Sequence, residues 1–234
     1  MKKIVVTGHK GYIGSEIFFS LQMDGLSPIG IDLLEGKDVL KHMPKNDITI
    51  HCATTFTGND VIEHNVNMTA KVLASTKHII FLSSAAVYGN NKNALEDDIL
   101  SPITPYGQAK EACEALIIKS NIPYTILRLS NVYSLRGGHG VIAHFLKGKN
   151  VIYGTENHIR DFVPVERIVQ VMRSILAEFE YKWFNEICNV SSGKGITINA
   201  LFKRLYPKKK PIYKEAKKEI QVSILNNEKL CVRV

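Results

Sequence analysis

The stretch VTGHKGYIGS, residues 6–15, constrains the fold most, because it places three glycines directly after an apolar run. Gly8, Gly11 and Gly14 follow the β-branched residues of 4–6 and precede a stretch with helical periodicity. Glycine permits a tight turn and leaves no Cβ to block a pyrophosphate, and a helix start adds free N–H groups with a partial positive charge. A strand, this turn and a helix therefore predict a dinucleotide-binding site, with an ordinary strand-to-helix turn as the alternative.

Short apolar runs alternate with amphipathic stretches along the whole chain. Strands are expected at 3–7, 28–33, 48–53, 78–83, 123–129 and 185–191. Helices are expected at about 14–24, 60–76, 105–120, 165–180 and 197–206. Most strand runs are continuously apolar, as in strands covered on both faces, so the pattern predicts an α/β fold with a doubly wound parallel sheet. The glycine-rich stretch 134–160 is expected to be irregular and to form a lobe beyond the sheet.

The second expected strand ends in an acidic residue, Asp32, which lies 24 residues after Gly8. A carboxylate at this place accepts hydrogen bonds from both hydroxyls of an adenosine ribose and repels a 2′-phosphate. The sequence therefore favours NAD over NADP. A turn or helix-capping aspartate is the alternative.

Three further residues suggest acid–base chemistry. Tyr106 and Lys110 stand four apart at the start of an expected helix, so they project from one face. A nearby ammonium favours the phenolate, and we expect it to lower the pKa of Tyr106 into a range useful for a general base. Ser84 ends an expected strand at the sheet edge where such folds bind ligands, and it is placed to hold a substrate hydroxyl. The alternative is a pair of turn serines.

Composition sets outer limits. The chain has 234 residues, 45% of them hydrophobic and 22% charged, which is ordinary for one or two globular domains. No apolar run reaches the roughly 20 residues that span a bilayer, and the first residues lack the pattern of a signal peptide. Four cysteines without CxxC spacing indicate reduced thiols in a cytoplasmic protein. The histidines show no metal-ligand spacing, so no metal site is expected.

The formal net charge is +8, and eight of the 30 Lys and Arg residues lie within 203–218. This segment is either a solvated surface or a field that attracts an anionic partner. No nucleic-acid-binding motif accompanies it, so no nucleic-acid partner is expected.

The ordered motifs TGxxGxxG, SSAAVYG, PYGQAK, NVYSLR and RDFVPV resemble those of the extended short-chain dehydrogenases/reductases, and among them the NAD-dependent epimerase/dehydratase family. The resemblance implies a Rossmann-type sheet with a reduced C-terminal substrate lobe. The Rossmann domain is expected to comprise 1–133 and about 161–192. The lobe is expected to comprise 134–160 and 193–234.

The resemblance also implies roles for the residues that match the family's motifs. The implied catalytic residues are Tyr106, Lys110 and Ser84. The implied NAD-binding residues are Gly8, Gly11, Tyr12, Ile13, Gly14, Asp32, Ala53, Thr54, Lys110 and Leu129. The implied substrate-binding residues are Ser84, Asn131, Arg136 and Arg160. The planar fork of Arg160 suits a diphosphate, with an internal ion pair to Asp161 or Glu166 as the alternative.

The chain departs from the family's pattern at several places. Two alanines follow Ser84 where the family's dehydratases carry acidic residues, so dehydration is not expected. Met68 replaces a usual glycine, and the segment between Asp32 and Ile48 is too short for the usual helix, strand and loop. The chain is also shorter than is typical, and the usual final helix is expected to be missing.

These observations together predict a cytoplasmic, NAD-dependent nucleotide-sugar epimerase. A nucleotide-sugar 4-ketoreductase with the same residues and a non-catalytic NAD-binding protein are the alternatives. The resemblance further implies a homodimer formed through the helices at 60–76 and 105–120, with Ala109, Ala112, Cys113 and Leu116 on the outward faces.

Overall fold

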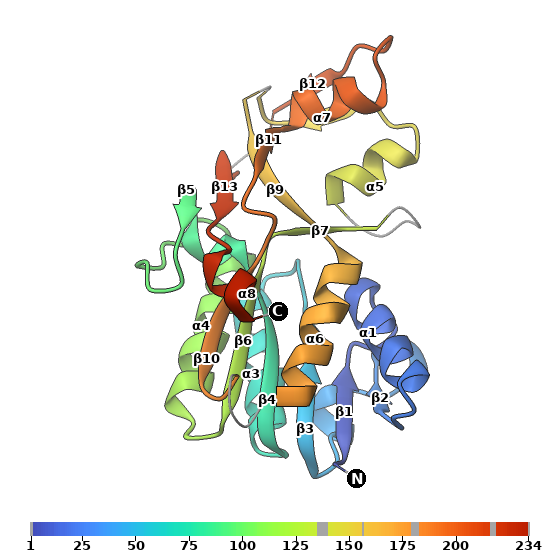
Figure 1. The fold of residues 1–234 in the computed structure, drawn as a ribbon, viewed down its shortest axis with the longest axis vertical. Coiled ribbons are helices and arrows are strands. Elements are labelled where there is room, and N and C mark those ends of the chain that lie inside the picture. Colours follow the sequence, from blue (N-terminus) through green and yellow to red (C-terminus); the bar gives the residue numbers. More distant parts are fainter. Residues whose placement is uncertain (1, 135–139, 156, 179–182, 216–218, 234) are drawn as a thin grey trace.

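The computed structural model of the protein describes residues 2–134, 140–155, 157–178, 183–215 and 219–233 (Figure 1). Its centre is a six-stranded parallel sheet in the order β10-β6-β4-β3-β1-β2. Its strands are β1 (Ile4–Thr7), β2 (Ile29–Ile31), β3 (Asn46–His51), β4 (Thr76–Ser84), β6 (Tyr124–Leu129) and β10 (Glu186–Val190). Every strand predicted from the sequence is present within two residues of its expected ends, so the predicted α/β sheet is confirmed.

The strand order creates a switch point beside β1. This strand pairs with β2 on one side and with β3 on the other. Ligands bind outside the carboxyl ends of parallel strands at such points. The described connection from β2 to β3 holds only a 3₁₀ turn, η1 (Leu33–Glu35), and a short helix, α2 (Val39–His42), which confirms the shortening expected there.

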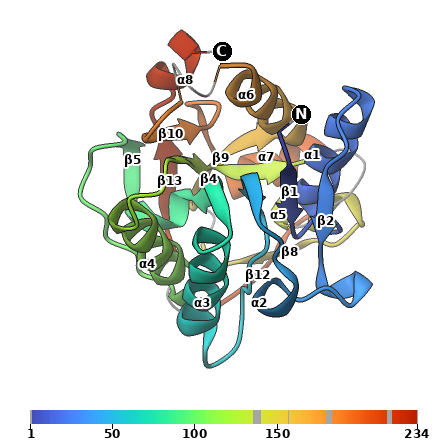
Figure 2. The ribbon, with the colours of Figure 1, turned by 90° about the horizontal axis from the view of Figure 1, so that it is seen from below.

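Helices cover both faces of the sheet (Figure 2). One face carries α1 (Tyr12–Met23) and α6 (Val165–Glu178), and the other carries α3 (Val61–Leu73) and α4 (Pro105–Lys119). In α6 the buried residues recur at spacings of three and four, which turns one apolar side of the helix toward the sheet. Two apolar cores result, one on each side of the sheet.

The start of α4 is defined by local chemistry. Thr104 caps this helix, because its hydroxyl accepts a hydrogen bond from the N–H of Gly107 at 3.1 Å. Pro105 occupies the first turn, where its missing N–H costs nothing. The cap therefore fixes where Tyr106 and Lys110 leave the helix.

A second sheet extends beyond the carboxyl ends of the central strands (Figure 1). Its strands are β5 (Asn91–Ala94), β7 (Asn131–Tyr133), β9 (Ile159–Pro164), β11 (Gly195–Thr197) and β13 (Val222–Leu225). Farther out lie α5 (Gly140–Leu146), β8 (Val151–Tyr153), α7 (Ile198–Leu205) and β12 (Ile212–Lys214).

The prediction that 134–160 is irregular is wrong, because α5, β8 and the start of β9 lie within this stretch. Gly140, Gly148 and Gly154 have positive φ angles and stand at the ends of α5 and β8, where they do not interrupt either element. Apolar side chains from α5, β8 and α7 form a separate small core that holds these elements together.

The described chain ends in a short helix, and the expectation that the family's usual final helix is missing remains a prediction. Glu228–Arg233 form a short helix, α8, which packs against β10. Its Leu230 belongs to the same apolar core as α6. The division into a Rossmann domain and a lobe at the predicted boundaries remains a prediction.

The structure corrects the expected outward face of α4. Ala109 and Cys113 are fully buried, because this side of α4 packs against α3 and the sheet. Ala112 and Leu116 are partly buried, and Leu116 also packs against the core on this side of the sheet. Among the described residues, no helix has the length and apolar character to cross a membrane.

Candidate functional site

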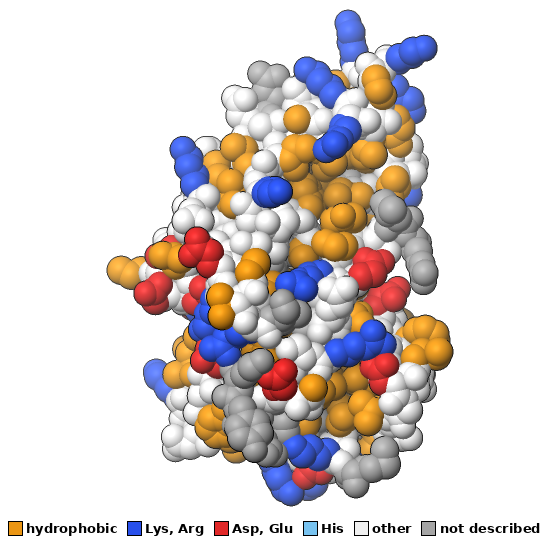
Figure 3. All heavy atoms as spheres, viewed as in Figure 1, with side chains coloured by type: hydrophobic (Ala, Val, Ile, Leu, Met, Phe, Trp, Pro, Cys, Tyr) orange, Lys and Arg blue, Asp and Glu red, His pale blue; other side chains and the backbone are white. Residues whose placement is uncertain are grey.

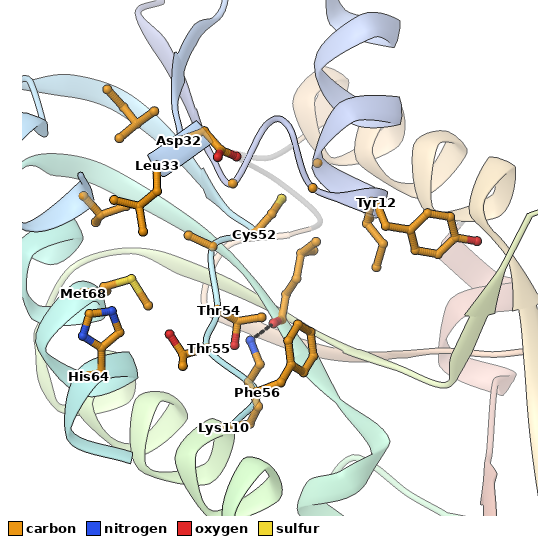
Figure 4. A pocket seen from close by; sticks show the side chains of 18 of the residues that line it. Tyr12, Asp32, Leu33, Cys52, Thr54, Thr55, Phe56, His64, Met68 and Lys110 are labelled. Carbon is orange, nitrogen blue, oxygen red and sulfur yellow. Dashed lines mark hydrogen bonds between the residues drawn. The ribbon is translucent and has the colours of Figure 1, made fainter. Parts of the chain in front are cut away.

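One pocket of about 320 Å³ opens at the switch point, and it collects most of the predicted site residues (Figure 4). The predicted residues that line it are Gly8, Gly11, Tyr12, Ile13, Gly14, Asp32, Ala53, Thr54, Tyr106, Lys110 and Leu129. The lining residues that sequence reasoning missed include Leu33, Asp38, Val39, Cys52, Thr55, Phe56, His64, Met68 and Ser83. Most of the missed residues follow strand ends or lie on α3, and they become neighbours only through the fold.

The glycine turn has no room for side chains. Gly8 has a φ of +68°, and a Cβ there would lie 2.7 Å from the backbone nitrogen of Ala53. A Cβ at Gly14 would overlap the carbonyl oxygen of Gly8. Gly11 is the N-cap of α1 and provides no side chain to occupy the helix's first N–H groups. The turn thus brings bare backbone and a helix N-terminus to the pocket, as a pyrophosphate requires.

Asp32 lies at the end of β2, beside this turn (Figure 4). Its two carboxylate oxygens each accept a backbone N–H at 2.9 Å, one from Lys10 and one from Leu34. These bonds hold the carboxylate against the turn, and each oxygen keeps a lone pair for a ribose hydroxyl. The residues fit the adenosine half of a dinucleotide.

A buried asparagine holds the loop after β3. Asn65 of α3 accepts hydrogen bonds from the Thr54 hydroxyl at 2.9 Å and the Thr55 N–H at 3.1 Å. Its own amide donates to the Thr55 carbonyl at 2.9 Å. Asn65 therefore fixes the wall of the pocket that Ala53 and Thr54 form, although neither periodicity nor composition singled it out.

Ser84 hydrogen-bonds to Tyr106, which lines the pocket, but Ser84 itself is not among the lining residues. Ser84 ends β4, and its hydroxyl accepts the N–H of Ala86 at 3.2 Å. Burial raises the pKa of Tyr106 to about 12, while a side-chain hydrogen bond with Ser84 acts in the opposite direction. The ring of Phe56 stacks on that of Tyr106 with centroids 5.0 Å apart. The predicted lowering of the Tyr106 pKa is thus wrong for the protein's own groups, because burial outweighs the hydrogen bond with Ser84.

Lys110 is only 3% exposed and donates to the carbonyl of Leu82 at 2.7 Å (Figure 4). Its ammonium lies 5.8 Å from the centroid of the Tyr106 ring and 4.6 Å from that of Phe81. Burial lowers the pKa of Lys110 to about 8. The helix therefore places Lys110 beside Tyr106 as predicted, with donor capacity left for a ligand.

A buried ion pair lies directly behind these residues, and sequence reasoning missed it. Glu114, one turn after Lys110 on α4, pairs with Arg128 of β6 at 2.7 Å, and both side chains are almost fully buried. Ser83, adjacent to Ser84, donates to the same carboxylate. The Arg128 guanidinium also donates to the Tyr88 hydroxyl at 2.8 Å. This network ties α4 to the strand ends that carry the site.

Two of the predicted substrate residues, Asn131 and Arg160, lie on the second sheet. Asn131 of β7 donates its side-chain amide to the Asp161 carbonyl at 3.1 Å. Arg160 of β9 donates to the carbonyls of Ile159 at 3.0 Å and Gln221 at 3.2 Å, and burial lowers its pKa. Asp161 accepts bonds from Ser192 and Gly193, so the alternative of an ion pair between Arg160 and Asp161 is not observed. Arg136 lies outside the described residues.

The comparisons with known proteins agree with this geometry. The model of the family described as NAD dependent epimerase/dehydratase matches residues 4–191. A provisionally named UDP-glucose 4-epimerase of Methanocaldococcus jannaschii is 32% identical over 248 aligned positions, which cover 85% of this chain and 80% of that protein. An ADP-L-glycero-D-manno-heptose-6-epimerase of Brachyspira hyodysenteriae is 25% identical and covers 91% of this chain, with 82% of its own length matched.

The fold is similar to that of a solved UDP-glucose 4-epimerase from Thermotoga maritima, crystallised with UDP-glucose. That structure has a TM-score of 0.80 and 28% identity, and the match covers 97% of this chain and 90% of that chain. The second sheet and outer lobe are thus included in the likeness.

Proposed function

The chain belongs to the NAD-dependent epimerase/dehydratase family, and we propose that within this family it is a nucleotide-sugar epimerase. It is an NAD-dependent enzyme of the extended short-chain dehydrogenase type. The observation that carries the proposal is that Tyr106 and Lys110 line the same pocket as the glycine turn and Asp32. A dinucleotide held by the turn and an acid–base residue would thus act on the same bound sugar.

The chain's own residues provide each part that cofactor binding needs. The N–H groups at the start of α1 would hold the pyrophosphate, and Asp32 would hold the adenosine ribose. Lys110 would bind the second ribose, and Leu129 and Ala53 would line the space beside the nicotinamide. Bound NAD⁺ supplies a hydride acceptor and a positive charge in the pocket.

Tyr106 would take the proton from a sugar hydroxyl that Ser84 orients. Because burial alone raises the pKa of Tyr106 to about 12, the phenolate depends on positive charge in the pocket, from Lys110 and from the ligands. The same tyrosine would return the proton when the sugar carbon is reduced on its other face. Holding the groups in one pocket replaces the random encounter of separate molecules.

Dehydration is disfavoured by the residues after Ser84. Ala85 and Ala86 begin the 3₁₀ turn η2 (Ala85–Tyr88), and neither carries an acid for water elimination. Arg160 remains the proposed partner of the substrate diphosphate. Its bonds to two carbonyls use one terminal nitrogen, Nη1, so other N–H groups of the fork remain for phosphate oxygens.

The experiment that tests the proposal uses UDP-glucose first, because it is the sugar nucleotide bound in the Thermotoga structure. The purified protein should release NAD on denaturation and convert UDP-glucose, or another nucleotide sugar in a screen, to its epimer without net NADH formation. Tyr106→Phe should bind NAD normally and lose about 10²–10⁴-fold in turnover.

Other outcomes would assign the alternatives. Stoichiometric consumption of NADH with a keto sugar would identify a ketoreductase. Tight NAD binding without turnover of any nucleotide sugar would indicate a non-catalytic NAD-binding protein. Turnover by Tyr106→Phe within a few fold of wild type would remove the proposed mechanism.

We further propose that the enzyme is a cytoplasmic homodimer. The accessible side of α3 and α4 would form the interface, where Ile62 and Ile118 are 39% and 46% exposed. The four free cysteines support a reducing compartment. A monomer mass in light scattering at micromolar concentration would contradict the dimer.

A further inference from the structure

The outer end of the lobe is built from two segments that are distant in the sequence. We call residues 140–153 and 198–214 the lobe tip. Strand β12 pairs with β8 in parallel, and the Ile212 N–H donates to the Asn150 carbonyl at 2.8 Å. Phe145, Ile152 and Phe202 form its small core. The lobe tip is therefore one packed unit, at one end of the longest axis of the molecule (Figure 1).

The positive charge of the protein is concentrated on this unit. The lobe tip holds eight of the chain's 30 Lys and Arg residues and none of its 22 Asp and Glu residues, so the rest of the chain carries 22 of each and has no formal net charge. All eight cationic side chains are exposed: Lys147, Lys149, Lys203, Arg204, Lys208, Lys209, Lys210 and Lys214. Figure 3 shows several Lys and Arg side chains gathered at this end of the molecule.

Apolar side chains are exposed among these cations. Leu146, Tyr153, Leu205, Ile212 and Tyr213 are between 38% and 53% exposed. They come from the ends of α5 and α7 and from the paired strands β8 and β12. Orange side chains accordingly lie between the blue ones at this end in Figure 3.

We propose that the lobe tip docks on a membrane surface that contains anionic lipids. Lysines near an anionic leaflet are attracted electrostatically, and exposed aliphatic and tyrosine side chains insert at the boundary between headgroups and acyl chains. Seven of the eight cations are lysines, and the side chains between them include Leu and Ile, a combination that suits a lipid surface better than nucleic acid. The attachment is peripheral, through side chains at the surface of the lobe.

Docking at the lobe tip leaves the pocket accessible. The pocket is lined by residues of the glycine turn, α3, α4 and the strand ends, and by none of the lobe tip. The protein would bind a membrane with its outer end while the pocket at the central sheet faces solution. The proposal is independent of the epimerase proposal, because binding to vesicles requires no substrate.

The test is sedimentation of the full chain with vesicles of phosphatidylcholine alone or mixed with phosphatidylserine. We expect binding only to the mixed vesicles at about 0.1 M salt and loss of binding at about 1 M, where the Debye length falls to about 3 Å. The triple variant Lys203→Glu, Lys208→Glu and Lys210→Glu should bind at least about 100-fold more weakly. The reason is that each lysine near an anionic surface raises the affinity about fivefold.

A matched control carries the same charge change elsewhere. Lys41→Glu, Lys92→Glu and Lys119→Glu also alter three exposed lysines, all outside the lobe tip. This variant should keep binding within about tenfold of wild type. A third variant, Ile212→Ser with Tyr213→Ser, should weaken binding without changing its salt dependence. Thermal unfolding checks that every variant folds.

Three results would overturn the proposal. The first is absence of binding to anionic vesicles at about 0.1 M salt. The second is equal weakening by the lobe-tip and control triple variants. The third is binding to RNA or to polyglutamate with no binding to vesicles, which would assign the lobe tip to another class of polyanion.

Discussion

Glu114→Ala should be the most damaging single substitution behind the site. The variant leaves the Arg128 guanidinium, which is 3% exposed, without its carboxylate partner, and it removes the acceptor of the Ser83 hydroxyl. Removing one partner of a buried pair costs about 3–5 kcal/mol, because a charge stays buried without compensation. For a chain of this size, this cost lowers the melting temperature by roughly 6–20 °C.

Two further variants separate the charge from the packing. Arg128→Met alone should also be strongly destabilising, since it strands the carboxylate of Glu114. Glu114→Met with Arg128→Met should unfold at a higher temperature than either single variant, because no unpaired charge remains. The measurement is thermal unfolding by circular dichroism at neutral pH.

Glu111→Ala is the matched control, one turn earlier on the same helix. Glu111 is only partly buried. Its removal should change stability by no more than about 0.5 kcal/mol. The reasoning fails if Glu114→Ala costs less than about 1 kcal/mol, or if the double variant is as unstable as the sum of the singles.

Three other predictions concern the pocket and the second sheet. Because of Asp32, the wild type should bind NAD more tightly than NADP, and Asp32→Asn should reduce the difference between the two dissociation constants. Tighter binding of NADP by the wild type, measured by calorimetry, would contradict the role of Asp32 at the ribose. Arg160→Ala should weaken UDP binding by about 10- to 100-fold and leave NAD binding unchanged, whereas the opposite pattern would place Arg160 in the cofactor site. Burial lowers the pKa of Lys110 from 10.5 to about 8, so the unfolded chain holds a proton between these values that the folded protein has lost. Lys110 should therefore add up to roughly 3 kcal/mol to the free energy of unfolding between pH 8 and 10.5. Denaturant titrations of wild type and Lys110→Met over this range isolate the contribution as their difference, because the buried Cys52, Cys188 and Tyr106, whose pKa values burial raises, act in the opposite direction in both proteins.

The central sheet could be predicted because its signals are local. Runs such as HIIFL are apolar on both faces, and only strands covered by helices on both sides need that pattern. The glycine turn is equally local, since its conformation depends on residues within one turn of α1. Tyr106 and Lys110 could be placed because a capped helix start with Pro105 fixes their common face.

Other features depend on contacts between distant segments. Glu114 and Arg128 read as two ordinary charged residues until α4 packs on the sheet and buries both. The expectation that Cys113 faces outward is wrong, because helical spacing defines the faces of α4 but does not say which face meets α3. The pairing of β12 with β8 joins residues about 60 positions apart, and short runs such as IYK do not specify a partner.

The pKa values of Tyr106 and Lys110 also depend on burial, which arises only when distant segments pack together. A low-dielectric pocket favours the neutral form of every ionisable group, so it raises the pKa of Tyr106 and lowers that of Lys110 at once. Within the protein alone, the tyrosine therefore keeps its proton near neutral pH, and the lysine, with a pKa of about 8, is still mostly protonated there. Positive charge that enters the pocket with a ligand has a large effect there, because water does not screen it. Burial therefore opposes the phenolate while the pocket holds no ligand. For the same reason, the strength of Tyr106 as a base depends on the charge of the bound ligand.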